Sequence, residues 1–192
     1  MRPRWRTVLA TLAISGGLVL FAGVVYVYGG FFDVAASTRH GALTSWLIET
    51  ARMRSIATHA RNIQPPSGLD HPDQVLTGTE HFAAHCAMCH GAPGVPKGDI
   101  AQGMYPPPPD LVHAAGRYHD AELFWIIRHG IKMTGMPAWA DHSDDEIWAI
   151  VAFLKNLGSG MTEQQYVELI RATMTQGSHH HTDAPEGAHH HQ

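Results

Sequence analysis

Two cysteines and a histidine form the group of side chains with the clearest chemical potential. Cys86 and Cys89 are the only cysteines of the chain, and His90 follows the second of them directly. They stand too close together to cross-link distant parts of a fold, so they either pair with each other or bind a common ligand. The spacing C-x-x-C-H attaches haem: the two thiols add to the haem vinyl groups, and the histidine is then held at the iron. We therefore expect one covalent haem c on Cys86 and Cys89, with His90 as an axial ligand.

Two other kinds of cysteine site compete with this interpretation. A zinc site needs four ligands, usually with a second cysteine or histidine pair at motif spacing. Only His81 and His85 form such a pair in this region, and they are expected on the same helix as Cys86. A thioredoxin-like redox pair requires a βαβ context, and no segment alternates as a strand would. Covalent haem remains the favoured interpretation.

A methionine is expected on the other side of the iron, and the candidates are Met88, Met104, Met133 and Met136. Met88 lies between the two cysteines and would point away from the ring. Met136 lies in the sequence Thr-Gly-Met-Pro, where the glycine and proline would hold the loop and present a thioether. Met133 is the nearest rival, although packing is the ordinary role of a core methionine. We expect Met136 to be the ligand, because a flexible loop would not hold a weak Fe–S bond.

Three helices must position these side chains. Their predicted ranges are residues 79–88, 120–129 and 144–157. Thr77 with Glu80, and Ser143 with Glu146, are predicted capping boxes, and Gly130 is predicted to end the second helix. No segment alternates with period two, so we expect an all-α domain.

A long irregular stretch, residues 91–119, separates the first two of these helices. It is rich in glycine and proline and includes four consecutive prolines, residues 106–109. Such a stretch in a small domain needs a reason. Wrapping a large, rigid ligand would supply one.

With these features, residues 75–158 resemble the class I c-type cytochromes, of the membrane-anchored bacterial type. Gly78 and Phe82 stand eight and four residues before Cys86, as in the first helix of that family. The resemblance implies a cytochrome c fold around one covalent haem. It also implies that these two residues cross the last helix, where Ala149 and Phe153 are expected contacts.

The resemblance further implies that a proline carbonyl in the irregular stretch accepts the second N–H of His90. Any of Pro106 to Pro109 is open to that role, which would fix the imidazole and raise its basicity. Candidate contacts with the haem are Tyr105, Pro107, Arg128 and Trp139, for which core or surface roles are the alternative. A low-dielectric pocket is expected from Phe82, Leu111, Phe124, Ile127, Trp139 and Ile150.

The N-terminus reads as a membrane anchor. Three arginines in the first six residues precede an uncharged run, residues 7–32, whose apolar part covers about 30 Å of hydrocarbon as a helix. The alternative is a cleaved signal peptide, but its apolar region usually has only about 7–15 residues. We expect residues 1–33 to cross a bacterial inner membrane once. The arginines would stay in the cytoplasm and the haem domain would lie in the periplasm.

Residues 34–69 are expected to hold an amphipathic juxtamembrane helix, over residues 37–61, and then a Pro/Gly linker. The helix would lie on the bilayer or dock a partner subunit. The alternative is a solvated spacer helix. Trp46 and a long apolar stripe favour the first interpretation.

The haem domain is assigned to residues 70–158. Residues 159–174 are predicted to form a short helix capped by Thr162. Residues 175–192 form a histidine-rich tail that is predicted to be disordered.

A haem iron with both axial positions filled has no open site for a substrate, which indicates one-electron transfer. We therefore expect a mono-haem carrier rather than an enzyme, on the oxidising side of a respiratory or dehydrogenase pathway. Its donor and acceptor would be redox proteins, such as a membrane-bound or periplasmic dehydrogenase and an oxidase. Residues 70–158 carry 5 lysines and arginines against 11 aspartates and glutamates, a net charge of −6. That charge favours a partner with a basic surface. The net charge of the whole chain, −4, argues against nucleic acid as a partner.

Two alternative functions remain. A small haem peroxidase would require Met136 to detach and expose the iron. A metal-binding protein would use the histidine triplets of the tail, residues 179–181 and 189–191. A solvated tail, or the remainder of a purification tag, is the simpler explanation of those triplets.

Overall fold

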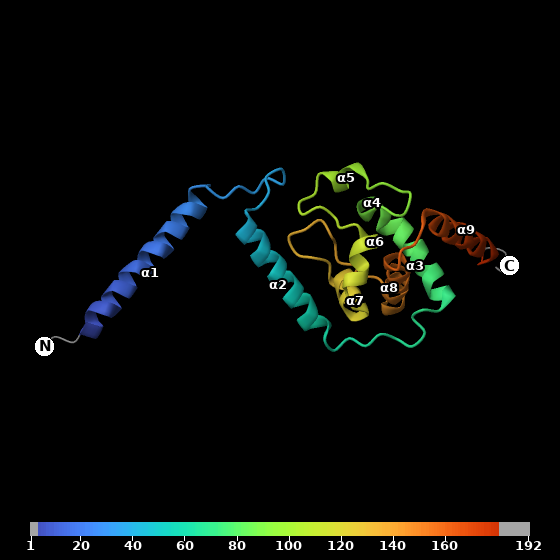
Figure 1. The fold of residues 1–192 in the computed structure, drawn as a ribbon, viewed down its shortest axis with the longest axis horizontal. Helices are drawn as coiled ribbons and strands as arrows, with labels where there is room; N and C mark the ends of the chain where they lie inside the picture. The colour runs from blue at the N-terminus through green and yellow to red at the C-terminus, as the bar shows by residue number, and fades with distance from the viewer. Residues whose placement is uncertain (1–3, 181–192) are drawn as a thin grey trace, which may run out of the picture. The chain divides into compact units, whose positions relative to one another are not determined.

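The structure is a computed structural model that describes residues 4–180, and side chains up to residue 175. Within that range the chain is helical and contains no strand beyond an isolated bridge between Ala92 and Val95. The all-α prediction is confirmed. The chain divides between Thr38 and Arg39 into two compact units (Figure 1).

The first unit contains one long apolar helix, α1 (Arg4–Tyr28). Its 25 residues extend over about 37 Å at 1.5 Å per residue, and none of them is buried. Among the described helices, only α1 is long and apolar enough to cross a membrane. This is consistent with the expected anchor.

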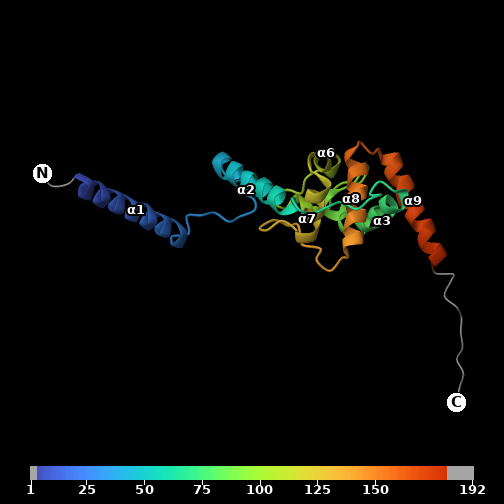
Figure 2. The same cartoon turned by 90° about the horizontal axis from the view of Figure 1, so that it is seen from below.

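Two crossing helices form the centre of the second unit: α3 (Pro72–His85) and α8 (Asp144–Gly158) (Figure 2). At the crossing, Gly78 lies so close to α8 that a Cβ on it would overlap the carbonyl oxygen of Ala149. One turn further on, the rings of Phe82 and Phe153 lie 4.7 Å apart, and both side chains are fully buried. The crossing predicted from the resemblance is therefore confirmed.

Replacing Gly78 by alanine should destabilise the protein by about 1–3 kcal/mol, because an extra methyl group has no room at the backbone crossing. Denaturant unfolding of the full-length protein in detergent would show a lower midpoint. The matched control is Gly103→Ala. There the nearest atom to a new Cβ would be 3.7 Å away, an ordinary contact. An unchanged midpoint for the Gly78 variant would contradict the close approach.

Helix α2 (Ala42–Ala60) packs on α7 (Asp120–His129) within the second unit. Its Ile56 and Ala60 are buried, and the rings of His59 and Trp125 lie 5.3 Å apart. The C-terminal half of α2 is therefore part of the same compact unit as the domain that follows. Its N-terminal half leaves four large apolar side chains exposed: Leu43, Trp46, Leu47 and Ile48.

The boundaries of the first predicted helix were wrong. Helix α3 begins at Pro72, seven residues earlier than predicted, so Thr77 lies inside the helix and cannot cap it. Proline suits the first helical turn because the N–H groups of that turn have no partner within the helix, so the N–H that proline lacks is not needed. The helix ends at His85, and the residues after Cys86 form a separate short helix, α4 (Ala87–His90).

The second and third predicted helices are confirmed, since α7 has the predicted bounds and α8 extends one residue further. In the predicted capping box, the Ser143 N–H donates to Glu146 Oε2 at 2.7 Å, and the Glu146 N–H donates to Ser143 Oγ at 3.3 Å. Between α4 and α7 lie short elements: α5 (Asp99–Gln102), α6 (Leu111–Ala114) and the 3-10 turn η1 (Ala115–Arg117).

The last described helix, α9 (Glu163–His180), is longer than predicted. Thr162 caps it as expected, since its Oγ accepts the N–H of Gln165 at 3.3 Å. Tyr166 is buried and α9 packs on α3, and a helix held in this way adds further turns at little cost. Residues 175–180 are therefore helical rather than disordered. Residues 181–192 lie outside the described part of the chain.

Candidate functional site

The cysteine–histidine motif lies where two helices meet. Cys86 is the C-cap of α3 and also the N-cap of α4. Cys89 and His90 lie on α4. The N–H of His90 donates to the carbonyl of Cys86 at 2.9 Å, which closes the short helical turn. Cys86 packs against the hydrophobic core, and both thiols are half-buried and free. The motif is therefore held by the α3–α8 crossing.

The environment of Cys86 does not suit a reactive thiolate. Burial, and secondarily the neighbouring Cys89, raises the pKa of the Cys86 thiol to about 12. Redox-active and metal-binding cysteines sit in surroundings that lower this pKa instead. The surroundings fit a cysteine whose sulfur becomes a neutral thioether, as covalent attachment to haem would make it.

His90 is oriented by the proline stretch. Its Nδ1–H donates to the carbonyl oxygen of Pro109 at 3.0 Å, because a carbonyl can only accept. Lys97 Nζ donates to the adjacent carbonyl of Pro108. Of the four prolines open to this role, the acceptor is thus Pro109, and the expected contact of Pro107 with haem stays a prediction. With Nδ1 engaged, Nε2 of His90 is left to bind a metal.

The protonation of His90 agrees with that role. Burial lowers the pKa of its imidazole, and nearby Lys97 acts in the same direction, against the opposing hydrogen bond to Pro109. The neutral imidazole, which is the form that coordinates metals, is therefore favoured at neutral pH.

The two rival methionines have different surroundings. Met136 is half-buried and packs against the hydrophobic core. Met133 is 93% exposed and has a φ of 60°, in the left-handed region that non-glycine residues rarely adopt. Of the two, only Met136 is packed against other side chains of the domain.

Hydrogen bonds hold the loop that carries Met136. The N–H of Ile131 donates to the carbonyl of Met136 at 3.2 Å, and the N–H of Met136 donates to Thr134 Oγ1 at 3.2 Å. Gly130 has a φ of 63°, and a Cβ on it would overlap the backbone of Pro137. Glycine is therefore needed there for the loop to fold back on α7.

Arg128 anchors the segment that follows this loop. Its guanidinium donates to the carbonyls of Ala140, at 3.2 Å, and of His142, and it pairs with Asp144. These contacts give Arg128 a structural role and leave its expected contact with haem a prediction.

The two aromatic candidates also have protein partners. The Trp139 ring lies 5.1 Å from the rings of both His85 and His142. The Tyr105 hydroxyl accepts the N–H of His40 at 3.0 Å, which connects the proline stretch to the segment before α2. Neither geometry tests contact with a haem.

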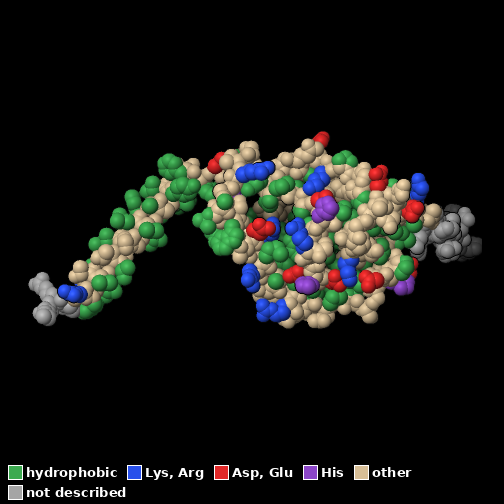
Figure 3. All heavy atoms as spheres, viewed as in Figure 1, with side chains coloured by type: hydrophobic (Ala, Val, Ile, Leu, Met, Phe, Trp, Pro, Cys, Tyr) green, Lys and Arg blue, Asp and Glu red, His purple; other side chains and the backbone are tan. Residues whose placement is uncertain are grey.

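The surroundings of the motif are mostly apolar. Of the six residues expected to line a low-dielectric pocket, Phe82, Phe124, Ile127 and Ile150 are buried, and Leu111 and Trp139 are half-buried. A cavity of about 430 Å³ borders His90 and includes Leu111 and Leu157 in its walls. The face of the second unit seen in Figure 3 is hollowed, with hydrophobic side chains beside the hollow.

Sequence reasoning did not find several positioning residues. Lys97 and Thr134 gave no signal of their own, because their roles depend on which carbonyls and turns the fold brings near. Gly130 was predicted only as the end of a helix, and its close approach to Pro137 was not foreseen. His142 was missed for the same reason, since it lies 57 positions after its neighbour His85.

Comparison with known proteins finds one family model that is similar to this region. Residues 73–154 match the family model described as cytochrome C oxidase, cbb3-type, subunit III. The match includes the motif and the Met136 loop but not α1, α2 or α9. No curated protein sequence matches the chain.

Proposed function

Because residues 73–154 form a c-type cytochrome domain, we propose that this chain is a membrane-anchored electron carrier with one covalent haem c. The observation that carries the proposal is the hydrogen bond from His90 to Pro109. It fixes the ring orientation of the histidine in a haem-attachment motif and places the ring proton on Nδ1, which leaves Nε2 to bind an iron.

Four side chains would hold the haem. Cys86 and Cys89 would form the two thioethers, His90 would offer Nε2 on one side, and Met136 would offer its sulfur on the other. The haem would supply reversible one-electron chemistry. Because His90 and Met136 would both bind the iron, they would leave no position on it for a substrate.

The protein around the site would favour the reduced state. Methionine as a ligand raises the reduction potential, and the buried Phe82, Phe124 and Ile150 disfavour the extra positive charge of the ferric form. We infer a carrier on the oxidising side of its pathway.

The location and the partners follow from charge and hydropathy. The arginines before α1 favour an N-terminus in the cytoplasm, which would place the haem domain in the periplasm. The net charge of −6 over residues 70–158 favours donors and acceptors with basic surfaces. A dehydrogenase and an oxidase are the candidate partners, and the oxidase named in the matching family description supports the second.

Spectroscopy and kinetics on the full-length protein in detergent test this function. We expect a six-coordinate, low-spin haem that accepts and returns one electron and does not turn over hydrogen peroxide. Electron exchange with the partner should slow as salt rises. A five-coordinate resting spectrum with peroxide turnover would instead support a peroxidase. A flat salt dependence would remove only the proposed electrostatic attraction.

A further inference from the structure

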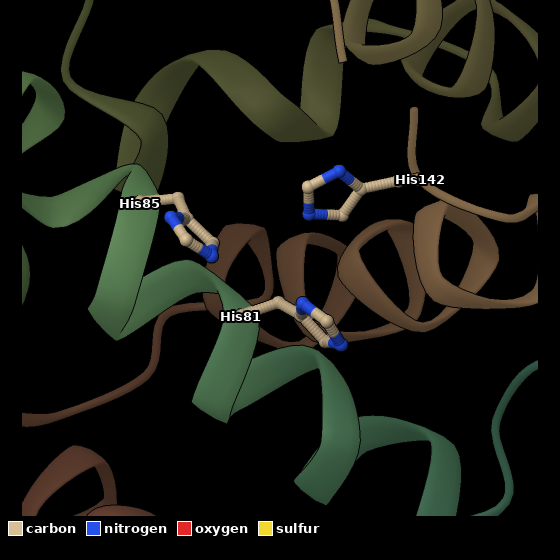
Figure 4. Close-up of side chains that lie close together, drawn as sticks. All are labelled: His81, His85 and His142. Atoms are coloured by element: carbon tan, nitrogen blue, oxygen red, sulfur yellow. The ribbon is translucent and has the colours of Figure 1, made fainter. Parts of the chain in front are cut away.

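Three histidines outside the proposed haem ligands form a cluster on the second unit. His81 and His85 are one turn apart on α3, and His142 lies in the segment just before α8. One ring nitrogen from each lies within 4.8 Å of those of the other two. Figure 4 shows the three imidazoles around a shared space.

The arrangement is close to what a metal ion needs. The ring centroids are 6.3 Å apart for His81 and His85, and 5.6 Å apart for each of these with His142. Around a tetrahedral zinc ion with Zn–N bonds of about 2.0–2.1 Å, the nitrogens would lie about 3.3 Å apart. The ring nitrogens now lie within 4.8 Å of one another. Side-chain rotations that bring them closer by roughly 1.5 Å would reach the spacing around zinc.

A carboxylate lies beside the cluster. Glu146 Oε1 is 3.8 Å from Nε2 of His81. The other oxygen, Oε2, is engaged in the capping box with Ser143. The group beside the imidazoles is thus negatively charged and held in place, so it would serve as a fourth ligand or as a partner of a bound water.

The backbone that carries His142 is fixed as well. Its carbonyl accepts a hydrogen bond from Arg128, and its ring packs against Trp139. His81 is half-buried, with 21% of its side chain exposed. Two of the three imidazoles are therefore held by their surroundings before any ion binds, which lowers the cost of ordering them.

We propose that His81, His85 and His142 bind a divalent transition-metal ion, with zinc as the ion that best suits three imidazoles and a carboxylate. None of these three histidines is among the proposed haem ligands. The site would tie the helix that leads into Cys86 to the segment that follows Met136, and so connect the two parts of the chain that carry the proposed haem ligands.

Calorimetric titration with zinc chloride at pH 7.5 tests the proposal on the full-length, haem-loaded protein. The six histidines of the tail triplets are first replaced by glutamine, so that the tail does not contribute binding. We expect one zinc ion per chain. The variants His85→Gln and His142→Gln are measured separately. In each, the dissociation constant for zinc should rise at least about 10-fold, because even the loss of a residue that only supports a metal ligand lowers the affinity by about that factor.

The matched control is His71→Gln, at the cap before α3. It removes an exposed histidine outside the cluster and should leave zinc affinity unchanged. An unchanged haem spectrum in each variant shows that the domain has folded. The proposal fails if the tail-substituted protein takes up no zinc at a one-to-one ratio. It also fails if both cluster variants bind zinc as tightly as their parent.

Discussion

Replacing Met136 by alanine should remove the weak far-red absorption band of the ferric protein, which reports an iron–sulfur bond. The reduction potential should fall by on the order of 0.2 V, since axial ligands set haem potentials over a range of roughly 0.8 V. The physical reason is that the thioether stabilises the ferrous iron, and water or hydroxide in its place does not. Spectroscopy of the oxidised protein and a potentiometric titration measure both effects.

The Met136→Ala variant also tests the alternative function, a haem peroxidase. Without the methionine, one axial position is open, so peroxide turnover absent from the parent protein should appear. The matched control is Met133→Leu, which changes a side chain that is 93% exposed on the same loop. This control should keep the far-red band, the potential and the inertness toward peroxide. If Met133→Leu loses the band and Met136→Ala keeps it, the ligand has been assigned to the wrong methionine.

Replacing Cys86 and Cys89 together by alanine should abolish covalently bound haem. Two thioethers are the only covalent connection that the chain offers, because it has no other cysteine. In the parent protein we expect the pigment to stay with the polypeptide in acid acetone and to stain on a denaturing gel. In the double variant the pigment should dissolve in the acetone, or the protein should be colourless.

Met88→Ala is the matched control for the double variant. Met88 lies between the two cysteines and is 59% exposed, so its loss should leave haem attachment intact. Each cysteine replaced alone should leave one thioether, and the haem should still resist extraction. Pigment that acid acetone removes from the unaltered protein would exclude covalent attachment, whatever the variants do.

The packing of α2 buries part of the apolar stripe that the sequence predicted to be exposed. The stripe predicted to lie on a bilayer or on a partner is divided between two environments. Ile56 and Ala60 are buried within the second unit, whereas Leu43, Trp46 and Leu47 are exposed. The sequence predicted an exposed apolar surface along the whole helix. In the structure only the N-terminal half of α2 offers such a surface.

The sequence by itself determined the chemistry that depends on local order. Cys86, Cys89 and His90 are neighbours along the chain, so their spacing is enough to predict haem attachment. The bounds of α7 and the Ser143 cap of α8 were predictable for the same reason, because caps and helical periodicity act over a few residues. Gly78 and Phe82 were placed against α8 through the resemblance to a family.

Only the tertiary structure decided which distant groups meet. Four consecutive prolines are equivalent in sequence, and the path of the chain alone selects Pro109 as the partner of His90. The start of α3 was missed because Pro72 and its cap lie before the apolar pattern that signals the helix. His142 joins His81 and His85 only because α3 and α8 cross and Arg128 holds the segment before α8. Contacts between residues far apart in the chain arise from burial of shared surfaces, and no local pattern records them.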